Sequence, residues 1–160
     1  MTNSTLQQWH NGVRLAQVSH ARAAARYDQL HQILGLSVTV ISVIVGTSVF
    51  STLSSTNNTW ILGIVGAISV VAAILSGIQT FLNYGQVAAK HQSAANKYGK
   101  IRRRIEELLN MADAPAEMNS LVKAIREDWD ILEDEAPTVP QRFHDVARDI
   151  VLGQGSHPST

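Results

Sequence analysis

A stretch of sixty-one residues, from Gln29 to Ala89, contains no Asp, Glu, Lys or Arg, although the chain carries 13 basic and 13 acidic residues. Two apolar runs, 33–53 and 60–82, lie inside it and are separated by a short polar loop. An α-helix rises about 1.5 Å per residue, so roughly 20 apolar residues cross the hydrocarbon core of a bilayer. We therefore expect a transmembrane helical hairpin. The alternative is a very hydrophobic hairpin in a soluble core, but helices of that kind normally carry charges on one face.

The charges that flank the hairpin predict its orientation. Arg14, Arg22 and Arg26 precede the first span, six basic residues from Lys90 to Arg104 follow the second, and the connecting loop has none. Positively charged flanks remain in the cytoplasm, so both termini are expected there. No small-residue cleavage site follows the first run, which argues against a cleaved signal peptide.

The segments next to the hairpin repeat apolar residues at alternating spacings of three and four. One such pattern runs from Leu6 to Leu34 and the other from Tyr84 to Ala112. This alternation is typical of the seam of a coiled coil or a tight helical bundle. We expect cytoplasmic helices at about 5–32 and 83–112, each continuous with its span.

Two shorter helices are expected after these. Asp and Pro within 113–115 suit the start of a helix at about 116–135, which has one apolar and one acidic face. Two prolines separate it from a last helix at about 141–152, and 153–160 is expected to be a disordered tail. The predicted fold is all-α, with one domain at 1–152.

A short motif, His-x-x-Ala-Ala-x-x-Tyr, occurs twice, from His20 to Tyr27 and from His91 to Tyr98. In an antiparallel hairpin, Tyr27 should lie near the level of His91 and His20 near the level of Tyr98. We expect Tyr–His contacts, within one chain or between chains, to close the cytoplasmic neck of the hairpin. A metal pair or a pH sensor is the alternative for the histidines, but their seam positions favour a structural role.

Several segments occur in a characteristic order. They are the basic helix around His20 to Tyr27, the span ends VIVGTSVFSTL and ILSGIQTFLNY, the segment AAKHQSAANKYGKIRRRIEELL, and EAPTVP. In this combination the chain resembles the SLATT family of two-transmembrane effector domains from bacterial nucleotide-sensing conflict systems, over about 14–140. The resemblance implies an effector that perforates or depolarises the inner (plasma) membrane when a nucleotide-signalling or sensor protein partner triggers it.

Small and hydroxyl residues are dense in both spans. In the first span, one face carries Gly35, Thr39, Ser42 and Gly46. In the second, the candidates for lining a pore are Ser69, Ala73, Ser76, Thr80, Asn83 and Gln79. One interpretation is helix packing, because small residues permit close approach and hydroxyls bond across helices. The other is a pore in a homo-oligomer, which would have little ion selectivity because nothing charged lines it.

A basic cluster follows the second span: Lys100, Arg102, Arg103 and Arg104. In one interpretation the cluster only sets the orientation of the spans in the membrane, and its side chains are simply solvated. In the other it binds anionic headgroups, a nucleotide or nucleic acid. Nucleic acid is not expected as a partner. The acidic face of the helix at 116–135 is a further candidate partner for 102–104.

The sequence shows none of the motifs for common catalytic chemistry. It has no His-Glu-x-x-His pattern, no glycine-rich phosphate loop and no cysteine. We expect no enzyme activity, no cofactor and no metal site. The predicted function is a pore-forming, homo-oligomeric membrane effector. The alternative is a non-conducting membrane anchor that acts as a scaffold and recruits a cytoplasmic partner. An intramembrane enzyme is not favoured, because the sequence offers no set of catalytic residues.

Overall fold

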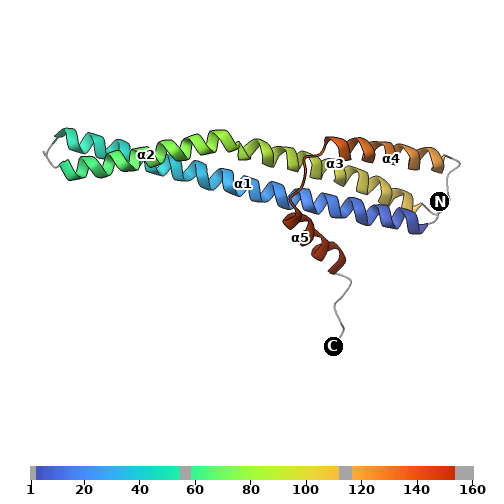
Figure 1. Cartoon of the computed structure of the whole chain (residues 1–160). Coiled ribbons are helices and arrows are strands. Elements are labelled where there is room, and N and C mark those ends of the chain that lie inside the picture. The colour runs from blue at the N-terminus through green and yellow to red at the C-terminus, as the bar shows by residue number, and fades with distance from the viewer. Residues whose placement is uncertain (1–2, 55–58, 112–116, 154–160) are drawn as a thin grey trace, which may run out of the picture. The chain divides into compact units, whose positions relative to one another are not determined.

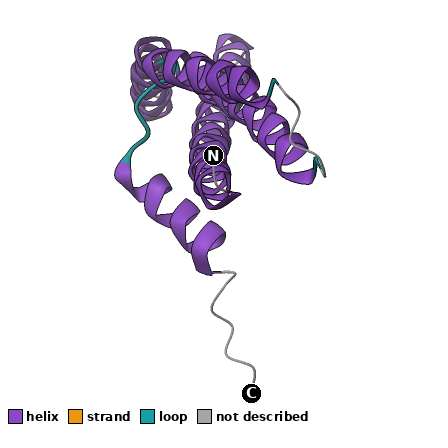
Figure 2. Cartoon of the chain, turned by 90° about the vertical axis from the view of Figure 1, so that its right-hand side faces the viewer, coloured by secondary structure: helices purple, strands orange, loops and turns teal. Residues whose placement is uncertain are grey.

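The computed structural model describes residues 3–54, 59–111 and 117–153, which form five α-helices and, in these ranges, no strand (Figures 1 and 2). The helices are α1 (Asn3–Ser54), α2 (Thr59–Leu82), α3 (Tyr84–Asn110), α4 (Met118–Glu135) and α5 (Gln141–Leu152). The predicted all-α fold is confirmed. α1 runs unbroken through both the expected cytoplasmic helix and the first span.

The expected continuity of the second span with the helix after it is interrupted at one residue. α2 ends at Leu82 and α3 begins at Tyr84, and between them Asn83 has a φ of 41°. This left-handed conformation is uncommon for residues other than glycine, and asparagine is among those that tolerate it best. The Asn83 N–H donates to the Gln79 carbonyl at 3.2 Å, and the Gln86 N–H donates to the Asn83 carbonyl at 3.0 Å.

The chain divides into two compact units. One is the hairpin unit, residues 27–86, and the other is the bundle unit, residues 1–26 together with 87–160. α1 and α3 each contribute residues to both units.

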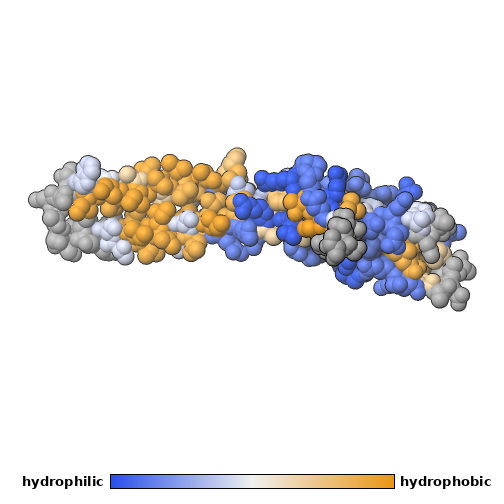
Figure 3. All heavy atoms as spheres, turned by 90° about the horizontal axis from the view of Figure 1, so that it is seen from below, coloured by the Kyte–Doolittle hydropathy of each residue, from blue (hydrophilic) through white to orange (hydrophobic). Residues whose placement is uncertain are grey.

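In the hairpin unit, α2 runs antiparallel to the second half of α1 (Figure 1). Many aliphatic and aromatic side chains of this unit are exposed, and Trp60 and Phe81 are 77% and 88% exposed. Figure 3 shows hydrophobic residues over much of the face that it views. Both α1 and α2 contain windows long and apolar enough to span a membrane, and no residue of either window is buried within the protein. A soluble core hairpin would bury these side chains, so this unit is the membrane-spanning part.

In the bundle unit, the first part of α1 packs with α3 and α4 around one apolar core. The heptad positions predicted as the seam supply most of it, and Val13 of α1 and Ile105 of α3 are fully buried. The buried residues of the core are Leu6, Val13, Ala94, Tyr98, Ile101, Ile105, Leu108, Val122, Ile125 and Leu132. Since α4 contributes three of them, it is an integral layer of the bundle.

The ends of the last two helices lie close to their predicted positions. α4 follows Glu117 and ends where the Ala136 N–H donates to the Leu132 carbonyl at 2.9 Å. α5 follows Pro140, has the predicted bounds and buries Ala147. The predicted start signals at 113–115, most of the interhelical loop (55–58) and the predicted tail from 154 onward lie outside the described residues.

Candidate functional site

The residues predicted to line a pore mostly share one side of α2. Residues three or four apart along a helix point the same way, and four of the candidates follow this spacing in α2, while Asn83 comes directly after its last residue. We call the five residues the polar stripe: Ser69, Ala73, Ser76, Thr80 and Asn83. Ser69 is half-buried, whereas the other four residues are exposed. α1 therefore leaves most of the polar stripe uncovered.

Gln79 packs inside the hairpin. Its side chain is half-buried, and its Nε2 atom lies 3.4 Å from the position that a Cβ on Gly35 would occupy. The missing side chain of Gly35 therefore makes room for the Gln79 amide between α1 and α2. This places Gln79 beside the polar stripe, and its role in a pore stays a prediction.

Several hydroxyl groups of the spans donate hydrogen bonds within their own helices. Ser69 Oγ donates to the Val65 carbonyl at 2.8 Å, and Thr80 Oγ1 donates to the Ser76 carbonyl at 3.0 Å. On α1, Thr39 donates to the Gly35 carbonyl at 2.9 Å in the same way. Each hydroxyl proton is thus satisfied without a partner outside the helix, while the oxygen keeps a lone pair to accept from water. This arrangement fits both helix packing and pore lining.

Aromatic rings meet at the end of the hairpin unit that joins the bundle helices in sequence. Tyr27 of α1 stacks on Tyr84 of α3, with ring centroids 5.9 Å apart and an interplanar angle of 21°. The nearby ring of His31 lies 3.3 Å from where a Cβ on Gly85 would be, so only glycine fits there without a shift. The predicted contact between Tyr27 and His91 stays a prediction.

His20 of α1 and His91 of α3 form a buried pair in the bundle unit. Their Nδ1 atoms lie 3.0 Å apart, and the two residues are 4% and 2% exposed. Tyr98 stacks on His20 with ring centroids 5.4 Å apart, which agrees with the expected proximity of these two residues. The helices approach closely here because the surrounding positions are small and buried: Ser19, Ala23, Ala24, Ala94 and Ala95.

A bond between two Nδ1 atoms constrains the protonation of both rings. One Nδ1 must donate and the other must accept, so the two imidazoles are in different tautomers and cannot both be charged. Burial, and then the neighbouring His91, lower the pKa of His20 to about 4, and burial also lowers the pKa of His91. Both rings are therefore neutral at pH 7.

The alternative considered for this pair, a metal site, has little support from the surrounding residues. A structural zinc site takes four ligands. Within the described ranges, no group of three or more His, Cys, Asp or Glu side chains is placed to hold a metal ion.

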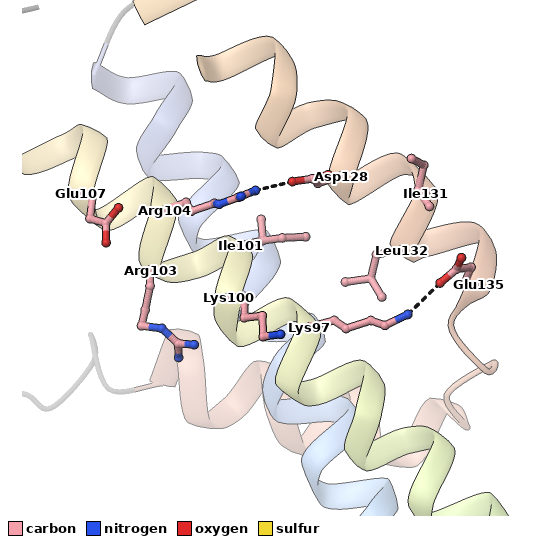
Figure 4. A pocket seen from close by; sticks show the side chains of 10 residues that line it. All are labelled: Lys97, Lys100, Ile101, Arg103, Arg104, Glu107, Asp128, Ile131, Leu132 and Glu135. Carbon is pink, nitrogen blue, oxygen red and sulfur yellow. Dashed lines mark hydrogen bonds and ion pairs between the residues drawn. The ribbon is translucent and has the colours of Figure 1, made fainter. Parts of the chain in front are cut away.

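Two ion pairs join α3 to the acidic helix α4, and one of them involves the basic cluster (Figure 4). Arg104 pairs with Asp128, and Lys97 Nζ lies 2.8 Å from Glu135 Oε2. Arg102 pairs with Glu106 on its own helix at 3.5 Å. The expected contact between the acidic face and 102–104 is thus made by Arg104.

Glu106 also links α3 to α1. The Nε2 atom of His10 lies 2.9 Å from Glu106 Oε1. This hydrogen bond is the main reason why the pKa of Glu106 is lowered, with Arg102 and Arg103 contributing through their charge. The carboxylate thus stays ionised to lower pH than usual.

Sequence reasoning missed the way α4 docks on α1. Trp9 and Trp129 meet edge to face, with ring centroids 6.0 Å apart and an interplanar angle of 83°. Beside them, a Cβ on Gly12 would lie 3.3 Å from the Trp129 ring. Gly12 itself was the signal available in the sequence, because a glycine inside a helix often marks a position where another segment approaches the helix closely.

No curated protein and no solved structure matches this chain. A family model does match, over residues 3–139, and its description is "SMODS and SLOG-associating 2TM effector domain family 4". The matched range contains the hairpin and α4 and stops before α5. Since it covers most of the chain, and the structure contains the two apolar spans that the description requires, the chain belongs to this family of two-transmembrane effector domains.

Proposed function

We propose that the chain is a pore-forming effector of a bacterial conflict system, which oligomerises to permeabilise or depolarise the inner membrane when triggered. The observation that carries the proposal is the uncovered polar stripe on an otherwise apolar hairpin. Ser76 and Thr80 are exposed within it, while Val70 and Ile74 on other sides of α2 are exposed and aliphatic. Such a surface can face a shared axis with one side and lipid with the others.

Two helices cannot enclose an aqueous path, so the proposed activity requires several copies around a common axis. Hydroxyl oxygens along the polar stripe would accept hydrogen bonds from water in that path. Because the spans carry no formal charge, the pore would discriminate weakly between ions or be gated by its apolar constrictions. No catalytic residue is needed, and we propose that the protein is not an enzyme.

The orientation proposed for the effector places both termini in the cytoplasm. Basic residues flank both spans on the side of the bundle helices, which favours that side as cytoplasmic. In this arrangement the bundle unit is available to a signalling or sensor protein.

Conductance across a planar bilayer tests the proposal. The purified chain is reconstituted, and wild type is compared with Ser76→Leu and Thr80→Leu, which fill the polar stripe. Ala67→Leu is the matched control, because Ala67 is exposed about 160° around the helix from Ser69, at about 100° per residue. Discrete currents that the two stripe variants reduce, and that Ala67→Leu leaves intact, are the expected result.

A second candidate is the non-conducting scaffold, and one observation favours it. Apolar side chains are exposed on the last two helices, with Ile131 of α4 at 58% and Leu152 of α5 at 57%. Surfaces of this kind recruit protein partners. A correctly inserted wild type that stays silent, even with its trigger, would support this function over the pore.

A further inference from the structure

A groove of about 550 Å³ lies between α3 and α4 in the bundle unit (Figure 4). Volumes of this size accommodate small-molecule ligands. Its lining contains the buried side chains of Ile101 and Leu132, and the half-exposed side chain of Ile131 adds apolar surface. The groove therefore offers an apolar surface to a ligand.

Four cations line the same groove, all from α3: Lys97, Lys100, Arg103 and Arg104. Side chains three or four residues apart on a helix are neighbours, so these cations follow one another along about two turns. Two of them are held by α4, since Lys97 pairs with Glu135 and Arg104 pairs with Asp128. In the described part of the chain, Lys100 and Arg103 form no ion pair, and Figure 4 shows no interaction joining them to the carboxylates drawn.

We propose that this groove binds a ligand carrying two linked phosphate groups on an apolar or planar body. Lys100 and Arg103 would hold the first phosphate, and the guanidinium fork suits its oxygens. The second phosphate would compete with Asp128 and Glu135 for Arg104 and Lys97. The body of the ligand would lie on Ile101, Ile131 and Leu132.

Binding in this mode loosens the attachment of α4. The two ion pairs that the ligand replaces are polar links between α3 and α4, and all four of their side chains are about half-exposed. Exposed pairs of this kind contribute little stability each, so a phosphate can replace the carboxylate at low cost. The ligand would therefore exchange one set of partners for another without unfolding the apolar core.

Two kinds of molecule carry two linked phosphate groups on such a body. One is a soluble diphosphate such as a nucleotide, and the other is the membrane lipid cardiolipin. The probes are ADP, pyrophosphate and adenosine, added to the full chain in nonionic micelles, and cardiolipin mixed into the same micelles. Calorimetry measures binding of the soluble probes, and the shift in thermal midpoint measures binding of all four. ADP binding tighter than pyrophosphate, with adenosine silent, identifies a soluble ligand. Stabilisation by cardiolipin alone identifies the lipid.

Three variants locate the site. K100E/R103E should weaken binding at least about tenfold, the amount typical of one lost charge-assisted contact. K123E/R126E is the matched control, because it reverses two exposed cations on α4 that lie outside the groove, and it should bind as wild type does. D128N/E135Q removes the competing carboxylates and should bind more tightly than wild type.

Clear results would overturn the inference. It fails if neither ADP, pyrophosphate nor cardiolipin binds to wild type or to D128N/E135Q, or if K100E/R103E binds as tightly as wild type. If binding depends on Lys100 and Arg103 but D128N/E135Q does not tighten it, the competition with α4 is refuted. These readouts need no conductance, so they stand or fall separately from the proposed pore.

Discussion

His20 and His91 share one hydrogen bond through their Nδ1 atoms, 3.0 Å apart, at a site where both residues are almost completely buried. The residues come from α1 and α3, which are far apart in the chain, and Tyr98 stacks on the His20 ring. A shared proton between two neutral rings holds these helices together in the bundle unit. Protonation of the accepting ring removes the acceptor of this hydrogen bond. Protonation of both rings places two like charges in a buried site.

This pair predicts that the bundle loses stability as the pH falls. The pKa of His20 is about 4 in the folded chain, against the ordinary histidine value of 6.5 in the unfolded chain, so at pH values between these two the unfolded chain binds more protons. Stability then falls as the pH decreases from about 6.5 to about 4. The thermal midpoint of the full chain in nonionic micelles, followed by far-UV circular dichroism, should decrease through that window.

His20→Gln keeps a polar group at the site but cannot titrate, so its midpoint should vary less with pH than that of wild type. His31→Gln is the control, because His31 is exposed in the hairpin unit and should leave the wild-type dependence unchanged. Equal pH dependence in wild type and His20→Gln would show that other groups cause the effect.

The contact between Gly12 and Trp129 predicts a coupled pair of substitutions. Gly12→Val adds a branched side chain where even a Cβ would lie 3.3 Å from the Trp129 ring, so α4 must shift. Overpacking of this kind costs about 1–3 kcal/mol, more than the roughly 0.5 kcal/mol that valine gains over glycine in helix propensity. Thermal unfolding should show Gly12→Val as destabilised.

The same substitution should cost less in a Trp129→Phe background, because the smaller ring leaves space. A double-mutant cycle of the four proteins measures this coupling. Additive effects would show that the valine acts only on α1 and that the close approach contributes nothing.

The parts of the fold that follow from local patterns were predicted. The charge-free stretch located the hairpin, because a bilayer admits few charged side chains. The heptads marked Val13 and Ile105 as seam positions, and both are fully buried. α5 has the bounds that Pro140 and Gly153 predicted, because these residues limit where a helix can begin and end.

The remaining features depend on how distant helices meet. Sequence spacing placed His20 near Tyr98, but a difference of one helical turn decides whether His91 meets a tyrosine or a histidine, and only packing sets that register. Lys97 and Glu135 are 38 residues apart, and nothing local pairs them. The groove between α3 and α4 exists only because α4 docks there, so the basic cluster alone could not reveal it.

Asn83 predicts a contrast between two substitutions. Its φ of 41° suits glycine and asparagine, whereas a β-branched residue in the left-handed region costs roughly 1–2 kcal/mol. Asn83→Gly should therefore keep the wild-type thermal midpoint within a few degrees, and Asn83→Val should lower it. If Asn83→Val is as stable as wild type, α2 and α3 can join as one continuous helix and the break at this residue is not required.

A substitution at Gly77 can test how copies of the chain assemble, because it is not expected to disturb the packing within one chain. A Cβ added at Gly77 would meet nothing within 4 Å, so Gly77→Leu creates no clash inside the hairpin, and leucine is favoured over glycine in helices by about 1 kcal/mol. In the proposed oligomer, Gly77 lies next to Ser76 of the polar stripe, where a neighbouring copy would pack. Gly77→Leu should therefore insert and fold normally but yield fewer cross-linked oligomers in lipid vesicles.

Ala67→Leu serves again as the control, since Ala67 is exposed and lies about 180° around α2 from Ser76, at about 100° per residue, whereas Gly77 lies about 100° from Ser76. The control should leave cross-linking unchanged. Loss of oligomers in Gly77→Leu alone would place the contact between copies beside the polar stripe. Equal cross-linking in both variants and wild type would mean that Gly77 faces lipid, and the pore axis would then have to lie along another face of the hairpin.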